Sequence, residues 1–142
     1  MLRLSPSRWR TPLGTAGAVV LVAAGLVGAH LVERRNDQRE LTVHAEAITG
    51  GDARRGRVLF QQFGCGGCHQ LQGIPGARGM VGPPLDGIGQ RAIIGGRLDN
   101  TPENLSQWIR QPQAISPGTA MPNLGVSPAQ SRDLAALLYS ET

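Results

Sequence analysis

Lysine is absent from this sequence of 142 residues, and aromatic side chains are scarce, with two Phe, two Trp and one Tyr. All 14 cationic side chains are arginines, and Arg3, Arg8 and Arg10 precede the first apolar run. A nucleic-acid-binding surface would need a Lys/Arg cluster on one face with aromatic rings for base stacking. The sequence contains neither feature, so we predict no nucleic-acid partner.

Cysteine is also rare, with two residues, whereas Gly and Pro are abundant, with 20 and 10 residues. The part of the chain after residue 50 is short, and this composition would give it only a modest hydrophobic core. Domains of this size often depend on a disulfide, a metal or a cofactor for their stability. We therefore expect a non-protein group at the centre of the domain.

Residues 13–32 form an uncharged, apolar run of 20 residues. A helix of about 20 residues spans the ~30 Å hydrocarbon core of a bilayer. The arginines that precede the run place residues 1–12 in the cytoplasm and the rest of the chain outside. A cleaved signal peptide is the alternative, because Val27-Gly28-Ala29 are small, but signal h-regions usually run only about 7–15 residues. We predict a single-pass anchor in the cytoplasmic membrane with the folded domain on the periplasmic side.

Residues 33–50 are polar and are predicted to form a helical stalk, followed by an exported domain over residues 51–142. Asp52, Thr101 and Ser127 have the character of N-cap residues. They precede three segments with apolar side chains at helical spacing. The predicted helices cover residues 53–63, residues 102–111, where Pro112 follows, and a segment from residue 128 almost to the C-terminus. The predicted fold class is all-α.

The segment from Gln70 to Asn100 shows no convincing periodicity and contains many glycines, so we predict no β-strand in it. A long irregular loop inside a compact domain is uncommon. It is explained if the loop wraps around a large, rigid cofactor.

Cys65-Gly66-Gly67-Cys68-His69 has the C-x-x-C-H pattern of haem attachment. Two thiols three positions apart can both add to the vinyl groups along one haem edge, and the following imidazole can reach the iron. We predict one covalently attached haem c, with Cys65 and Cys68 as the attachment residues and His69 as an axial metal ligand.

Three other interpretations of the two cysteines are weaker. A structural zinc site needs four Cys/His ligands, and the other histidines, His30 and His44, lie in the apolar run and the stalk. A thioredoxin-like redox pair occurs beside a βαβ unit, and no strand is predicted. A disulfide across so short a loop would stabilise the fold little.

The second metal ligand is sought among the methionines that follow Met1. Met121 lies in Pro117-Gly118-Thr119-Ala120-Met121-Pro122, where prolines on both sides limit its motion and suit a thioether that reaches iron. Met80 is only 11 residues past His69 and is interpreted as a gap-filling side chain. The alternatives to Met121 are Met80 and an open position or another ligand. His/Met ligation would raise the reduction potential of the iron.

From Gly51 to its end the chain resembles the class I c-type cytochromes. The motifs that carry this resemblance are Gly51-Asp52, Gly56, Phe60, Cys65-x-x-Cys68-His69, Gly82-Pro83-x-Leu85-x-Gly87-x-x-x-Arg91, Leu105-x-x-Trp108-Ile109-x-x-Pro112, Pro117-Gly118-Thr119-x-Met121-Pro122 and Asp133-Leu134-Ala135-Ala136-Leu137-Leu138. The stretch from Asn100 to Pro122 is most similar to the cytochrome c domain fused to subunit II of some haem–copper oxidases, although here only a helix precedes the domain. The resemblance implies a small cytochrome c fold, with three main helices and long haem-wrapping loops, in a free-standing, membrane-anchored form.

The resemblance also implies roles for individual residues. The Pro83 carbonyl would accept a hydrogen bond from the His69 imidazole and orient it. Arg91 would bind a haem propionate, and Trp108 would pack beside the haem on its Met side. The alternatives are a turn residue, a solvated charge and a generic core residue, respectively. The positions where the first helix would cross the last are Gly56, Phe60, Leu134 and Leu137.

An iron with both axial positions filled has no open position for a substrate, so the predicted function is electron transport and not enzymatic catalysis. The leading hypothesis is a one-electron carrier that passes electrons from a quinol–cytochrome c reductase to a terminal oxidase in a respiratory chain. The alternatives are a permanent haem-bearing subunit of an oxidase, reductase or dehydrogenase complex and, more remotely, a gas-binding haem sensor.

Overall fold

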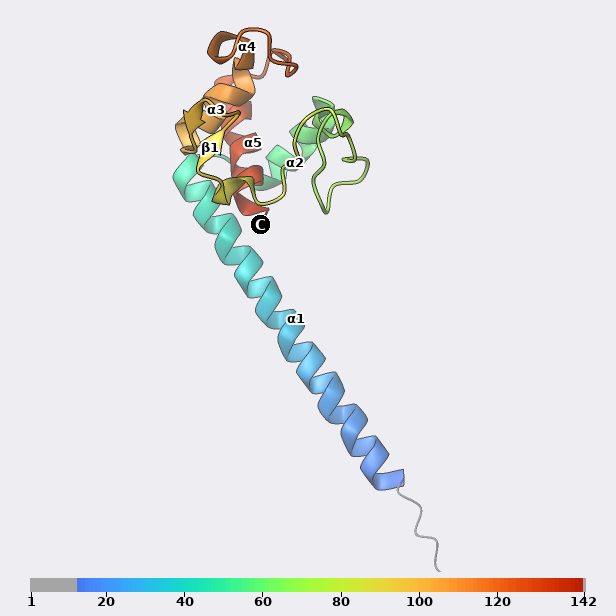
Figure 1. Cartoon of the computed structure of the whole chain (residues 1–142). Coiled ribbons are helices and arrows are strands. Elements are labelled where there is room, and N and C mark those ends of the chain that lie inside the picture. Colours follow the sequence, from blue (N-terminus) through green and yellow to red (C-terminus); the bar gives the residue numbers. More distant parts are fainter. Residues whose placement is uncertain (1–12, 142) are drawn as a thin grey trace, which may run out of the picture. The chain divides into compact units, whose positions relative to one another are not determined.

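The computed structural model describes residues 13–141, so the predicted cytoplasmic segment 1–12 lies outside the described residues. The chain divides into two compact units between Asn36 and Asp37. Helix α1, Leu13–Thr49, provides the described part of the first unit (Figure 1). Its side chains from Gly17 to Asn36 are exposed. Among the residues that the structure describes, α1 is the one helix long and apolar enough to cross a membrane, and it confirms the predicted N-terminal apolar helix.

Three helices form the frame of the second unit, and they are α2, Ala53–Gln62, α3, Pro102–Arg110, and α5, Pro128–Ser140. Both α2 and α3 pack on α5, which lies between them in Figure 1. Because it is covered on both sides, α5 buries every residue from Asp133 to Leu138. The predicted all-α class and the three predicted helices are confirmed.

Each of these three helices begins after its predicted N-cap residue. The side chains of Asp52, Thr101 and Ser127 accept a hydrogen bond from the backbone N–H three residues later, at 2.9, 3.2 and 3.3 Å. At α2 this bond, donated by Arg55, lowers the pKa of Asp52 below its ordinary value. Caps of this kind satisfy N–H groups that have no partner within the helix. The helix starts are therefore determined by local sequence.

The crossing of α2 and α5 depends on Gly56. A Cβ atom at this position would meet the backbone carbonyl of Asp133 and would lie 2.9 Å from the Cβ atom of Leu137. Phe60, one turn further along α2, is only 2% exposed and shares a core cluster with Leu134 and Leu137. The contact between the first and last helices of the domain, which the resemblance implied, is confirmed.

The prediction that residues 70–100 contain no strand is wrong. Strand β1, Ile93–Ile94, pairs antiparallel with β2, Leu98–Asp99. The turn between them uses Gly95 and Gly96, whose φ angles of +55° and +69° favour glycine. Strands of two residues are too short to produce an alternating pattern in the sequence, which is why they were missed.

A short fourth helix, α4, Pro112–Ile115, was also not predicted. Pro112 ends α3, as expected, because proline has no N–H to continue the helix. The same proline occupies the first position of α4, where a missing N–H costs nothing. The residue that stops one helix therefore starts the next, and α4 leads directly into the loop that contains Met121.

The end of α1 belongs to the second compact unit, which begins at Asp37. Ala45 is 1% exposed and Thr49 is 6% exposed. The Gln38 side-chain amide donates a hydrogen bond to the backbone carbonyl of Ser140 at 2.8 Å. These contacts lie in the segment predicted to be a polar stalk, so this segment, from Asp37 onward, is part of the second unit rather than a separate connector.

Candidate cofactor site

A cavity of about 370 Å³ lies at the centre of the second unit. Its walls are mostly apolar side chains that also form the hydrophobic core, including Phe60, Leu105, Ile109, Leu134 and Leu138. All the residues predicted for the site line this one cavity, namely Cys65, Cys68, His69, Pro83, Arg91, Trp108 and Met121. The structure therefore brings together residues that span more than a third of the chain.

The two cysteines lie at either end of a tight turn. The 3₁₀ turn η1, Cys65–Gly67, follows α2, and the backbone N–H groups of Cys68 and His69 both donate to the Cys65 carbonyl, at 3.2 and 2.9 Å. Both cysteines are free, and burial raises the pKa of the Cys65 thiol to about 11. No group of three or more His, Cys, Asp or Glu side chains that could hold a metal ion occurs among the described residues.

The His69 ring is held by the loop that follows it. Its Nδ1 atom lies 2.8 Å from the carbonyl oxygen of Pro83. A carbonyl oxygen only accepts hydrogen bonds, so Nδ1 carries the proton and Nε2 has the free lone pair. This is the geometry that the resemblance implied, and it leaves Nε2 available to a metal.

Gly82 supports the same ring from one side, and sequence reasoning gave this residue no role. A Cβ atom at position 82 would lie 2.6 Å from Nδ1 of His69. The Gly82 N–H donates to the Cys68 carbonyl at 2.9 Å, which fixes the loop against the cysteine turn. The imidazole thus contacts a backbone with no side chain in the way.

Arg91 fixes the shape of the Pro83 loop. Its Nη2 atom donates to the carbonyls of Pro84, at 2.6 Å, and Asp86, at 3.2 Å. The backbone carbonyl of Arg91 accepts a hydrogen bond at 2.8 Å from Asn100. Arg91 is therefore well positioned at the cavity, and its contact with a haem propionate stays a prediction.

Asn100 is a second residue that sequence reasoning missed. Its side-chain amide donates to the carbonyls of Ile88, at 2.7 Å, and Arg91, at 2.8 Å. The Tyr139 hydroxyl donates to the Asn100 side-chain oxygen at 2.8 Å. Asn100 thus connects the irregular loop to α5. Its position just before the N-cap Thr101 gave no sign of this connection.

Trp108 reaches the cavity from α3 and also contacts the hairpin turn. A Cβ atom at Gly95 would lie 2.6 Å from Cζ2 of the Trp108 ring. The ring is half-buried and is part of the boundary of the hydrophobic core. Its packing beside a haem stays a prediction.

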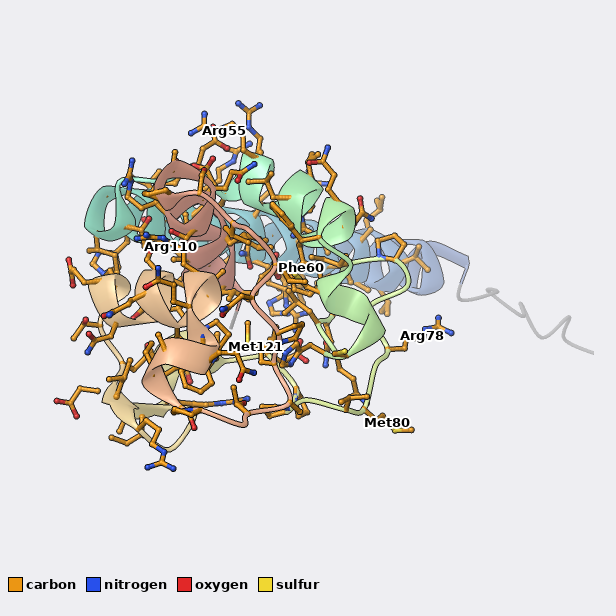
Figure 2. The ribbon with its side chains drawn as sticks, turned by 90° about the horizontal axis from the view of Figure 1, so that it is seen from above. Arg55, Phe60, Arg78, Met80, Arg110 and Met121 are labelled. Carbon is orange, nitrogen blue, oxygen red and sulfur yellow. The ribbon has the colours of Figure 1, made fainter. Side chains whose placement is uncertain are left out.

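The two candidate methionines occupy very different places. Met121 lines the cavity, whereas Met80 is 85% exposed and is not among the lining residues. Figure 2 shows Met80 at the outer edge of its loop, near Arg78, and Met121 on the inner side of the opposite loop. Met121 therefore lies at the cavity and Met80 does not, and ligation of a metal by Met121 stays a prediction.

The residues of this cavity fit a covalently bound haem. Two thiols at one turn, an imidazole with a free Nε2 and a thioether provide the required donors. Among the described residues that line the cavity, Arg91 is the one permanently charged side chain, so the walls suit a flat apolar ring with an ionised edge. The small helical fold and this donor set together are those of a c-type cytochrome domain.

Comparison with known proteins agrees with this class. The model of the cytochrome c family matches residues 53–141 of this chain. Because this match covers more than half of the chain, the protein belongs to the cytochrome c family. A cytochrome c domain implies haem c as its cofactor and electron transfer as its function. No solved structure matches the chain significantly.

The curated relatives are subunits of respiratory oxidases. The chain is 38% identical over 82 residues to cytochrome c oxidase subunit 2 of Alkalihalophilus pseudofirmus, which covers 58% of this chain and 23% of that protein. It is 33% identical over 76 residues to the same subunit of a Bacillus species, strain PS3, which covers 52% of this chain and 21% of the relative. The chain thus matches less than a quarter of the length of these two relatives.

Proposed function

We propose that the second unit holds one haem c through thioether bonds to Cys65 and Cys68, with His69 and Met121 as the axial ligands of the iron. The observation that carries this proposal is the convergence of these four side chains on one apolar cavity. The hydrogen bond from His69 to Pro83 supports it, because such a bond orients an imidazole and makes it a better metal ligand.

Arg91 and Trp108 complete the proposed site. The cationic Arg91 would bind a propionate while its hydrogen bonds to backbone carbonyls hold the guanidinium in place. Trp108 would cover the haem on the side of Met121. Trp108 reaches the cavity from α3, which packs on α5. The backbone of Arg91 is held by the hydrogen bond that its carbonyl accepts from Asn100.

The function that this site supports best is reversible one-electron transfer, which a bound haem iron supplies. With His69 and Met121 both bound to the iron, no coordination position would remain for a substrate, and the mostly apolar side chains of the cavity would surround the haem. A thioether ligand favours the ferrous state and raises the reduction potential. We therefore propose an electron carrier and not an enzyme in its own right.

We further propose that the carrier is anchored in the cytoplasmic membrane through residues 13–32, with residues 1–12 in the cytoplasm and residues 51–142 as the periplasmic haem domain. Its electrons would come from a quinol–cytochrome c reductase and go to a terminal oxidase, and the anchor would confine its diffusion to two dimensions. The oxidase-subunit relatives support a respiratory role. Alkaline phosphatase fused to the C-terminus should be active, because that enzyme matures only after export.

A permanent subunit of a respiratory complex is the second candidate. The observation in its favour is that the curated relatives are themselves oxidase subunits. Extraction in mild detergent followed by size analysis separates the two candidates. A carrier should elute alone, whereas a subunit of an oxidase, reductase or dehydrogenase should co-purify with its complex.

Covalent attachment is tested with Cys65→Ala and Cys68→Ala. The unaltered protein should keep its pigment in acidified acetone and give a reduced pyridine haemochrome spectrum of a haem with two thioethers. Each variant should contain little covalent haem and an unstable domain. Normal amounts of covalent haem in both variants would contradict the assignment.

The second ligand is tested with Met121→Ala, with Met80→Ala as the matched control. Loss of Met121 should abolish the weak near-infrared absorption band of ferric His/Met iron, and loss of Met80 should leave it unchanged. The opposite result would move the ligand to Met80. Ready binding of CO by the unaltered ferrous protein at neutral pH would instead favour the gas sensor.

A further inference from the structure

Gln113 lies in the short helix α4 and faces the loop that contains Met121. Its side-chain Nε2 donates to the backbone carbonyl of Thr119, at 2.6 Å, and to that of Met121, at 2.9 Å. Its side-chain oxygen accepts a hydrogen bond from the Gly118 N–H at 3.2 Å. One amide group therefore contacts three backbone positions in the four residues that end at Met121.

This arrangement uses both hydrogens and the oxygen of the amide. The three backbone groups belong to a loop that has no regular ladder of its own, so the side chain takes the place of a neighbouring strand or helix. Met121 has one further contact of this kind, since its N–H lies 3.5 Å from the Thr119 hydroxyl oxygen. The conformation of the loop depends on Gln113 more than on any periodic backbone structure.

Gln113 is itself firmly placed. Pro112, the residue before it, is fully buried. The backbone N–H of Gln113 also lies 3.5 Å from the side-chain oxygen of Asn123, on the far side of Met121. These hydrogen bonds of Gln113, which we call the brace, thus connect α4 to the chain on both sides of the methionine.

We propose that Gln113 is a positioning residue that keeps the Met121 thioether in the cavity and so limits its exchange for other ligands. The inference rests on the proposed axial role of Met121. If the loop were free to move, the state with Met121 away from the iron would be more populated. An external ligand binds only that open state, so its apparent affinity rises in proportion to the open fraction.

Imidazole binding to the ferric protein measures this open fraction, because imidazole displaces the thioether and abolishes the near-infrared band. The full chain in detergent is titrated with imidazole as the unaltered protein and as Gln113→Ala, which removes all three hydrogen bonds, and Gln113→Glu, which keeps only the acceptor. Gln111→Glu is the matched control, since Gln111 is exposed two residues earlier and receives the same charge. Covalent haem content is measured in every variant.

Gln113→Ala and Gln113→Glu should bind imidazole at least about tenfold more tightly than the unaltered protein, because both variants lose the two hydrogen bonds that Nε2 donates to the loop. A tenfold change in affinity corresponds to about 1.4 kcal/mol. Gln111→Glu should bind as the unaltered protein does. If Gln113→Ala fails to retain haem, Gln113→Glu decides, because its side chain has nearly the same size and shape.

Three negative outcomes are distinguishable. If both Gln113 variants contain normal haem and bind imidazole like the unaltered protein, while Met121→Ala lacks the near-infrared band, the brace is refuted and the axial ligand stands. If Met121→Ala keeps the band, the axial assignment itself fails. If Gln113→Glu and Gln111→Glu bind imidazole more tightly but Gln113→Ala does not, added charge near α4, and not the loss of the Gln113 hydrogen bonds, is responsible.

Discussion

At the residue scale, the His69 imidazole is held between a hydrogen bond and a bare stretch of backbone. Its Nδ1 donates to Pro83, and the Cα of Gly82 lies against the ring. Protein interiors are packed closely, so a single added methyl group forces its neighbours to move. The position of the ring therefore depends on the absence of a side chain at residue 82.

We expect Gly82→Ala to displace the His69 ring from its acceptor and to weaken haem retention, at a cost in stability of about 1–3 kcal/mol for the overpacking. Covalent haem per chain and denaturant unfolding measure the two effects. Gly67→Ala is the control, because a Cβ atom there meets nothing within 4 Å. Equal haem content and stability in the two variants would show that the ring tolerates the methyl group.

The residues that were found from sequence and those that were missed differ in how local their roles are. Cys65, Cys68 and His69 form one contiguous motif, so the sequence alone reveals them. Gln113 and Asn100 act through hydrogen bonds to backbone groups that only the folded chain brings near. No sequence pattern indicates that a glutamine or asparagine side chain will make such a contact, so the roles of these two residues could not be predicted.

At the scale of elements, the packing of α2 on α5 depends on a close approach of two backbones at Gly56. Glycine within a helix ordinarily costs about 1 kcal/mol relative to alanine. Here a methyl group at residue 56 would collide with the Asp133 carbonyl and the Leu137 side chain. Helix propensity therefore predicts that Gly56→Ala increases the stability of the fold, whereas packing predicts that it decreases the stability.

We expect packing to dominate, so that Gly56→Ala lowers the free energy of unfolding by about 1–3 kcal/mol. Chemical denaturation of the haem-loaded protein measures the change. Val58→Ala on the same helix is the control, since Val58 is 53% exposed and a surface substitution should change stability by no more than about 0.5 kcal/mol. A Gly56→Ala variant more stable than the parent would show that the helices can separate at no cost.

The C-terminal part of α1 is also a structural part of the haem domain. Removal of residues 1–36 behind a cleavable export signal should give a soluble, redox-active protein, because the second compact unit is then intact. Removal of residues 1–50 also deletes the buried Ala45 and the hydrogen bond from Gln38 to Ser140. We expect the shorter form to be less stable by about 1–3 kcal/mol, as measured by denaturant unfolding. Equal stabilities would mean that residues 37–49 are only a connector.

Elements with their own start signals could be predicted, and elements without them could not. Thr101-Pro102 and Ser127-Pro128 combine a cap with a proline at the first helical position, and both helices begin there. The two-residue strands of the hairpin have no such signal and owe their pairing to the glycine turn and to the Trp108 ring beside it. Only the tertiary structure defines them.

At the scale of the whole molecule, the haem-domain unit is electrically balanced. Residues 37–142 contain nine arginines and nine acidic residues, so the formal charge of this segment is zero with neutral histidines. The segments 64–77, 79–85 and 111–131, which contribute most of the cavity lining, contain no Asp, Glu or Arg. Charge therefore lies elsewhere on the domain, and Arg91 is the one permanent charge among the described lining residues.

This balance predicts that electron exchange with small redox reagents depends little on salt. Electrostatic steering changes association rates by about 10–10³-fold and weakens as salt screens the charges. For this domain, the rates with anionic hexacyanoferrate and with a cationic cobalt–phenanthroline complex should each change less than about tenfold between low and physiological salt. Stopped-flow oxidation of the ferrous protein measures both rates.

Val81→Glu tests whether the uncharged lining causes this insensitivity, because Val81 is 70% exposed and lines the cavity. A carboxylate there should slow the reaction with the anionic reagent at low salt and accelerate the reaction with the cationic one. As salt is added, the rate with each reagent should approach the rate of the unaltered protein with that reagent. If the unaltered protein already shows opposite, steep salt dependences for the two reagents, charges outside the cavity lining determine how fast the protein associates with them. The local absence of charge would then have no kinetic role.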